Sequence, residues 1–146
     1  MAAGLSLHPQ NLEAFRGRLN ELARRTLSHE QLQPRLLLDA EVILRELSLG
    51  QLEELRRLEP AGQGNPPVQL AVRNVSLHRP PQRMGRDHQH AKLGITDGRN
   101  VCEVVCWNCD KEALPTGNFD LAFVPQINEY NGSRSLQLKL LDWRPA

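Results

Sequence analysis

The transition that decides the fold lies at residues 55–66, which read Leu55-Arg56-Arg57-Leu58-Glu59-Pro60-Ala61-Gly62-Gln63-Gly64-Asn65-Pro66. Before this stretch, Ser48 and Gln51 have the spacing of a helical capping box, and leucines follow at helical intervals. The Pro, Gly and Asn residues of the stretch stop that helix. From Val68 onward the pattern changes to short β-like runs between turn signals. The stretch therefore joins a short helix to a β domain.

Five strands are predicted after this junction, over Val68–Leu77, Ala91–Thr96, Val101–Asn108, Phe119–Val124 and Ser135–Trp143. The predicted separators are Arg79–Gly85, Asp97-Gly98, Pro115–Asn118 and Asn131-Gly132. Asp-Gly and Asn-Gly are the dipeptides that tight hairpins prefer, because both central residues need a positive φ. Five short strands in about 80 residues match the strand count and size of an OB-fold. We therefore predict an α+β chain built around a small OB-type β-barrel.

Two shorter units of strand and helix are expected before the barrel. The first has the end of a strand at Ala2–Leu7 and a helix opened by His8-Pro9, since proline suits the first helical position. An apolar stripe follows in that helix, formed by Leu12, Phe15, Leu19 and Leu22. After a polar connector over Ser28–Pro34, the second unit has a predicted strand over Leu36–Val42 and then the capped helix.

The charge of the chain is small but unevenly distributed. The whole chain of 146 residues has a formal net charge of +1, whereas residues 67–109 contain six Lys/Arg and three Asp/Glu, a net charge of +3. This excess points mildly to a polyanionic partner. No apolar run reaches the roughly 18 residues that span a bilayer, and the N-terminus lacks the basic region of a signal peptide. We expect a soluble, cytoplasmic protein with no membrane partner.

Several segments, in order and spacing, resemble the C-terminal region of RecJ-type exonucleases of the DHH superfamily. The segments are Met1–Leu7, Asn11–Arg16, Asp39-Ala40-Glu41, Leu55–Pro66, Gly85–Leu93, Asn128–Gly132 and Leu136–Leu138. The resemblance implies that residues 1–33 are the C-terminal tail of a DHH-associated domain. It implies that residues 34–146 are a RecJ-type OB domain, with the barrel core at about residues 67–143.

The resemblance implies a parent protein that is a metal-dependent exonuclease specific for single-stranded DNA, acting in DNA repair and recombination with Mg²⁺ or Mn²⁺. This chain contains no Asp-His-His motif, no set of metal-binding aspartates and no Gly-Gly-His motif. We therefore expect no catalytic residue and no cofactor in this chain, and no nuclease activity from it alone. In that case Met1 is an internal residue of the parent.

An OB-fold binds single strands with cations that neutralise phosphates and with aromatic rings on which bases stack. The candidate DNA-binding residues are Arg73, Arg79, Arg83, Arg86, Lys92, Trp107, Tyr130, Arg134 and Lys139. Trp143 is a further available ring. The alternative is that both tryptophans pack in or around the barrel and that the arginines are only solvated. A rival function is a docking module, which packs on the catalytic domains of the parent or on a single-strand-binding protein.

Two further patterns are weighed against plainer interpretations. Cys102, Cys106 and Cys109 lie near His88 and His90 in sequence, but zinc needs about four converging N/S ligands. Cys102 and Cys106 share one face of a predicted strand, which favours buried thiols, so we predict no metal site. The glycines of Gly62–Asn65 would let the backbone approach a phosphate, but a structural turn is the favoured interpretation.

Overall fold

The computed structural model describes residues 4–109 and 114–146. Contacts divide the chain into a unit up to Leu36 and a larger unit over Leu37–Ala146. The first unit contains the whole segment assigned to a DHH-associated domain, residues 1–33, and that assignment stays a prediction. None of the helices in the described part of the chain is long and apolar enough to cross a membrane.

The N-terminal unit contains η1 (Pro9–Asn11), α1 (Leu12–Thr26) and α2 (His29–Leu32). Pro9 opens the helical segment, as predicted. The predicted polar connector contains α2, because Ser28 and Gln31 form a capping box that begins a helical turn. Residues 4–7 are not a strand, whereas residues 1–3 of the strand predicted over Ala2–Leu7 lie outside the described residues. An extended segment needs neighbouring strands to be stable, and the described part of this unit has none.

A short leading segment precedes the barrel, with β1 (Ala40–Glu41), η2 (Leu44–Glu46), α3 (Leu49–Leu55) and η3 (Arg56–Leu58). Half of the predicted capping box of α3 is present, because the side-chain oxygen of Ser48 accepts the backbone N–H of Gln51 at 3.3 Å. The Gln51 side chain accepts the Ser48 hydroxyl at 3.1 Å instead of the Ser48 backbone N–H. The strand predicted over Leu36–Val42 shrinks to β1. Only Ala40 and Glu41 find partners, in a parallel ladder with Leu70 and Ala71.

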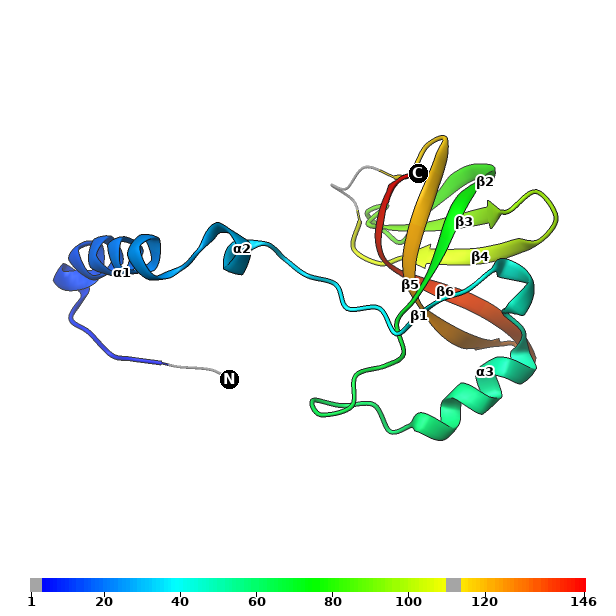
Figure 1. Cartoon of the computed structure of the whole chain (residues 1–146), viewed down its shortest axis with the longest axis horizontal. Helices are drawn as coiled ribbons and strands as arrows, with labels where there is room; N and C mark the ends of the chain where they lie inside the picture. The colour runs from blue at the N-terminus through cyan, green and yellow to red at the C-terminus, as the bar shows by residue number, and fades with distance from the viewer. Residues whose placement is uncertain (1–3, 110–113) are drawn as a thin grey trace. The chain divides into compact units, whose positions relative to one another are not determined.

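The barrel consists of β2 (Leu70–Met84), β3 (His90–Thr96), β4 (Val101–Cys106), β5 (Asn118–Tyr130) and β6 (Ser133–Pro145). The sheet order is β1-β2-β3-β4-β6-β5, and β5 pairs again with β2, which closes the barrel (Figure 1). β4 and β6 are parallel, with Val104 beside Leu138, and the other barrel pairs are antiparallel. The predicted OB-type α+β fold is confirmed.

Two strands are much longer than the sequence predicted, since β5 continues from Val124 to Tyr130 and β2 continues from Leu77 to Met84. The segment Arg79–Gly85, predicted as a turn, is almost entirely strand and contains Pro80 and Pro81. Register shifts between Leu77 and Arg79 and between Arg79 and Gln82 mark bulges, and bulges are where a strand tolerates proline. The true turn is Gly85–Gln89, and it begins with a φ of +89° at Gly85.

The two predicted hairpin dipeptides behave differently. Asn131 and Gly132 both have positive φ, at 48° and 74°, as their hairpin requires. At the other hairpin only Gly98 has a positive φ. There the Asp97 carboxylate accepts the backbone N–H groups of Asn100 at 2.7 Å and Arg99 at 2.9 Å. These bonds, chiefly those from Asn100, lower the pKa of Asp97 to about 2.

The core fills the barrel with aliphatic and phenylalanine side chains. Its fully buried members include Val75, Leu93, Ile95, Val104, Phe119, Phe123 and Leu138. Trp143 packs against this core, and its ring meets that of Phe119 edge-on at 6.3 Å. Packing around the barrel, the plainer of the two interpretations, therefore holds for Trp143. Cys102, Cys106 and Cys109 are buried as well, and burial raises the pKa of the Cys102 thiol.

Candidate nucleic-acid interface

The ladders of the barrel bring residues from four strands into two rows on one face, and these residues are polar except for the buried Gly94 and Val105. Side chains paired across neighbouring strands lie on the same face. One row contains Gln82, Lys92, Val105 and Lys139, and the next contains Arg79, Gly94, Glu103 and Gln137. We call the surface formed by these two rows the β3–β4 face. It is the part of the molecule where cations of the predicted DNA-binding set gather.

Trp107 follows the last residue of β4, beside the start of β3. Its ring meets that of His90 edge-on, with 4.8 Å between the ring centroids and 75° between the planes. The His90 ring is held in place because its Nδ1 atom accepts the backbone N–H of Asn108 at 3.0 Å. Trp107 remains 49% exposed. The structure therefore places this tryptophan outside the core, where a base can stack on it.

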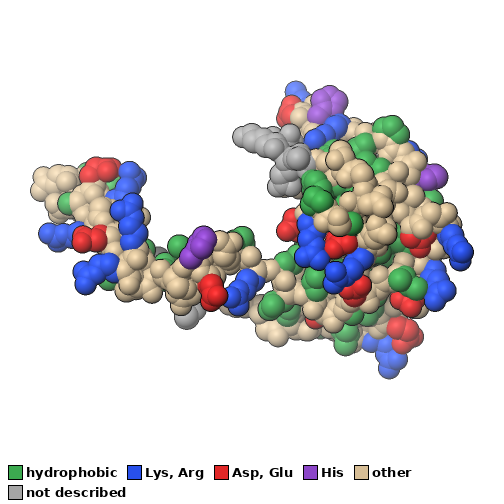
Figure 2. All heavy atoms as spheres, turned by 45° about the horizontal axis from the view of Figure 1, so that its top comes forward, with side chains coloured by type: hydrophobic (Ala, Val, Ile, Leu, Met, Phe, Trp, Pro, Cys, Tyr) green, Lys and Arg blue, Asp and Glu red, His purple; other side chains and the backbone are tan. Residues whose placement is uncertain are grey.

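Several predicted DNA-binding cations already have partners. Lys92 Nζ lies 3.0 Å from Glu103 Oε1, and Arg134 pairs with both Glu53 and Glu129. Arg83 donates to the backbone oxygen of Cys109 at 2.7 Å. Figure 2 likewise shows Lys and Arg side chains interspersed with Asp and Glu on the visible face of the barrel unit. A cation paired in this way attracts a phosphate less strongly than a solitary one.

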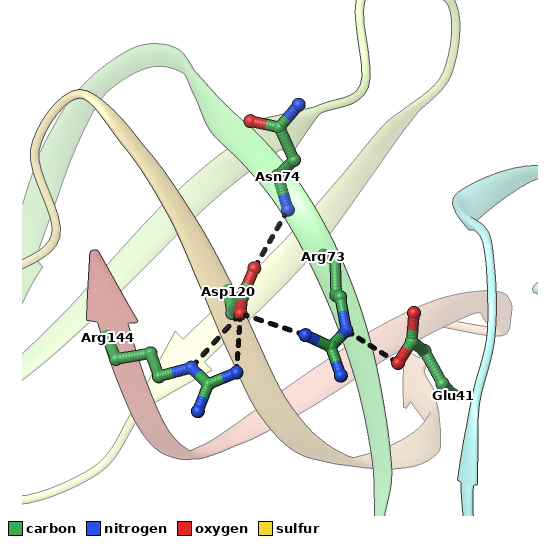
Figure 3. Close-up of polar contacts among 5 residues, drawn as sticks. All are labelled: Glu41, Arg73, Asn74, Asp120 and Arg144. Carbon is green, nitrogen blue, oxygen red and sulfur yellow. Dashed lines mark hydrogen bonds and ion pairs between the residues drawn. The ribbon is translucent and has the colours of Figure 1, made fainter. Parts of the chain in front are cut away.

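Arg73 belongs to a separate polar network that joins β1, β2, β5 and β6 (Figure 3). Its guanidinium lies 2.6 Å from Glu41 and 3.9 Å from Asp120, and the Glu41 bond raises its pKa. Asp120 also accepts the backbone N–H of Asn74 at 3.1 Å and two bonds from Arg144. The Asn74 bond, followed by Arg144, lowers the pKa of Asp120. The network is structural, and it lies outside the two rows of the β3–β4 face.

Four cations of the predicted set have no carboxylate partner among residues 4–109 and 114–146. Arg83 is one of them, but the backbone oxygen of Cys109 holds it; the others are Arg79, Arg86 and Lys139. Arg79 extends across Gly94, whose missing Cβ would lie 3.4 Å from Arg79 Cγ and Nε. Arg86 is exposed in the turn between β2 and β3. Tyr130, 71% exposed, lies at the β5–β6 hairpin, with Arg134 close by in the same hairpin.

Sequence reasoning missed the polar centre of this face. The Gln137 side-chain amide donates to Glu103 Oε1 at 2.8 Å, so Glu103 serves both Gln137 and Lys92. Glu103 lies on the opposite face of β4 from the buried Cys102 and Cys106. Its partners come from other strands, and no local pattern gives that pairing.

Comparison with known proteins identifies the family of this barrel. The family model described as the RecJ OB domain matches residues 38–142. The chain belongs to this family. The match covers the leading segment and the whole barrel except the last residues of β6.

Curated relatives of this chain carry the name single-stranded-DNA-specific exonuclease RecJ. The protein from Bacillus subtilis (strain 168) is 27% identical over 145 residues, which are 97% of this chain and 18% of that protein. The protein from Dickeya dadantii (strain 3937) is 31% identical over 141 residues, which are 94% of this chain and 24% of that protein. The chain thus spans a quarter or less of the curated relatives it matches.

A solved structure supports the same fold. The crystal structure of RecJ in complex with Mn²⁺ from Thermus thermophilus matches with a TM-score of 0.73 and 22% identity. The match covers 98% of this chain and 20% of that protein. A second crystal structure of the same protein is a complex with Mg²⁺. At this level of identity, the match shows a shared fold.

The described residues of this chain do not form a metal site. No group of three or more His, Cys, Asp or Glu side chains in that part of the chain converges to hold an ion. The cysteines lie in the interior, and His90 is oriented by Asn108 and Trp107. No catalytic step is therefore assigned to a metal held by these residues.

Proposed function

We propose that this chain is the OB-domain region of a longer exonuclease that degrades single-stranded DNA in repair and recombination. In this proposal the barrel holds and guides the strand, while the longer protein carries out hydrolysis with Mg²⁺ or Mn²⁺ at residues outside this chain. Support comes from the family match and from the names of the curated relatives. The Mn²⁺ and Mg²⁺ complexes of the Thermus thermophilus protein support the choice of metal.

One observation carries the DNA-binding proposal. Trp107 is half exposed at one end of the β3–β4 face, and Arg79 and Lys139, on that face, have no carboxylate partner among the described residues. Stacking on an aromatic ring tolerates any base, and lone cations attract the phosphate backbone. With one ring and few unpaired cations, the face is suited to an accessory contact of modest affinity.

A specific observation favours an additional docking role for the N-terminal unit. The three leucines of the apolar stripe of α1, Leu12, Leu19 and Leu22, are exposed, and Phe15 is half-buried. A helix with such a stripe ordinarily buries it against another element. We assign it to packing on the remaining domains of the longer protein. Docking on a single-strand-binding protein is the alternative use of the same stripe.

Fluorescence anisotropy of a labelled oligothymidylate, titrated with this chain, tests the DNA-binding proposal. Trp107→Ala is expected to weaken binding by about 1–3 kcal/mol, because a stacked base loses its platform. Leu37→Ala is the control, since it removes an exposed apolar side chain that is not in the predicted DNA-binding set. Circular dichroism of both variants checks that the fold is intact. Equal binding by the wild type and by Trp107→Ala would contradict the proposal.

A further inference from the structure

The ladder between β2 and β5 ends abruptly at one end of the barrel. Its last pair there is Leu70 with Phe123. Continued by the same register, the ladder would set Val68 opposite Pro125 and Pro66 opposite Ile127. Proline has no N–H group to donate, and prolines occupy positions 66, 67 and 125. The segment before β2 and the second half of β5 therefore do not pair with each other.

A groove of about 870 Å³ lies where the segment before β2 and the second half of β5 separate. Its walls are the segment Pro66–Val68, the segment Val124–Glu129 of β5, and leucines of α3 and η3. The leucines are Leu52, Leu55 and Leu58, and Trp107 also lines the groove. Figure 1 shows α3 beside the hairpin end of β5 and β6, where Glu53 pairs with Arg134. All residues that line the groove belong to the unit over Leu37–Ala146, and its leucines and Trp107 provide apolar contact surface.

One wall of the groove is an unpaired strand edge. From Val124 to Tyr130, β5 pairs with β6 on one side. On its other side, no strand of the described residues pairs with this part of β5. Unpaired backbone N–H and C=O groups on a strand edge are a template for another extended chain. Pro125 itself has no N–H group to donate, so the residues beyond it, Gln126–Glu129, are the part of this edge that offers backbone hydrogen bonds in addition to apolar contacts.

The ionisable groups of the lining determine which chain fits. They are three carboxylates, Asp39, Glu59 and Glu129, and one guanidinium, Arg56. Arg56 lies 3.7 Å from both Glu53 and Glu59, so its charge is already shared between two carboxylates. Glu129 lies 3.0 Å from Arg134, which does not line the groove. The lining itself has two more carboxylates than guanidinium groups, and this excess of negative charge repels a phosphate backbone and attracts Lys and Arg side chains.

We propose that this groove binds an extended segment of a partner protein, with alternating apolar and cationic side chains, along the free edge of β5. Apolar side chains of the segment contact Leu55, Leu58 and Trp107. Its cationic side chains lie near Glu59 and Glu129. This site adjoins the β3–β4 face and shares Trp107 with it, but it uses none of the cations of that face.

The test uses a short acetylated peptide in which leucine and arginine alternate, with a matched peptide that has glutamate in place of arginine. Titration into the ¹⁵N-labelled chain is expected to shift the amide signals of Val124–Glu129 with the arginine peptide. The glutamate peptide should bind much more weakly. Glu59→Gln combined with Glu129→Gln should weaken the arginine peptide about fivefold, which corresponds to about 0.5 kcal/mol from each of two exposed ion pairs. The control pair, Glu13→Gln with Glu21→Gln on α1, should leave binding unchanged.

A second form of the peptide tests the role of the strand edge. Methylation of its backbone nitrogens removes the N–H donors that strand addition requires, and binding should be lost. Unchanged binding of the methylated peptide would overturn strand addition, and equal binding of the glutamate peptide would overturn the charge argument. Shifts of Val124–Glu129 by oligothymidylate would identify nucleic acid as the occupant. A dimer in sedimentation, abolished by Ile127→Asp, would identify a second copy of the chain.

Discussion

Lys92 Nζ lies 3.0 Å from Oε1 of Glu103, at the centre of the surface that was expected to meet DNA. Glu103 also accepts the side-chain amide of Gln137. Both members of the ion pair are 30% exposed, so water screens their attraction and the pair can open. A carboxylate at this position reduces the attraction of the β3–β4 face for a polyanion.

Replacing Glu103 with glutamine is therefore expected to strengthen binding to single-stranded DNA. Each phosphate contact contributes about −0.7 to the slope of log K against log[salt], so Arg79, Arg86 and Lys139 give about −2. Release of Lys92 should steepen the slope to about −3. Anisotropy titrations over a series of salt concentrations measure both quantities. Glu54→Gln on α3 is the matched control. An equal gain in DNA affinity for that variant would mean that the change in net charge, and not the release of Lys92, strengthens binding.

The network around Asp120 predicts a pH dependence of stability. Its pKa lies below the ordinary value of 3.8, chiefly because of the Asn74 N–H. A carboxyl group with a lowered folded pKa stabilises the native state fully above its unfolded pKa, and this stabilisation is lost as pH falls through the folded value. Asp120→Asn should therefore flatten the decline of the unfolding free energy below about pH 4. Urea denaturation at several pH values measures this, and an unchanged decline would contradict it.

The turn between β2 and β3 depends on glycine at position 85. Gly85 has a φ of +89°, and an added Cβ would lie 2.5 Å from Gln89 Oε1. Gly85→Ala should lower the unfolding free energy by about 1–2 kcal/mol, the cost of a left-handed conformation for a residue with a Cβ. Gly64→Ala is the control, because nothing lies within 4 Å of its added Cβ and its φ is not positive. Equal stability of the two variants in thermal or chemical denaturation would refute the prediction.

The buried cysteines are expected to be unreactive in the folded protein. Thiolate is the reacting species, and burial raises the pKa of Cys102. Ellman's reagent should modify Cys102, Cys106 and Cys109 only as the chain unfolds. Val101→Cys supplies an exposed thiol in the same strand and should react at once. Rapid modification of the wild-type chain would show that the interior opens readily.

The sequence pattern was sufficient to predict the strands of the barrel, but it did not predict which charged side chains pair with one another. Alternation and hairpin dipeptides predicted all five strands, since these signals are local. Pro80 and Pro81 concealed the second half of β2, because proline is tolerated there only at bulges. The partners of Arg73, Lys92 and Arg134 include Glu41, Glu103 and Glu53, which other elements bring near. The sequence also could not show that Trp107 is exposed and that Trp143 packs on the core, because both depend on how the barrel closes.

The position of β6 has a consequence for how this barrel is made. β6 is the last strand in sequence, but it lies between β4 and β5 in the sheet. During synthesis the first four barrel strands therefore emerge before the ring can close. Until then, β4 and β5 each present an open edge, and such edges favour pairing with other chains. A nascent chain stalled before Ser133 is thus a candidate for chaperone capture or aggregation.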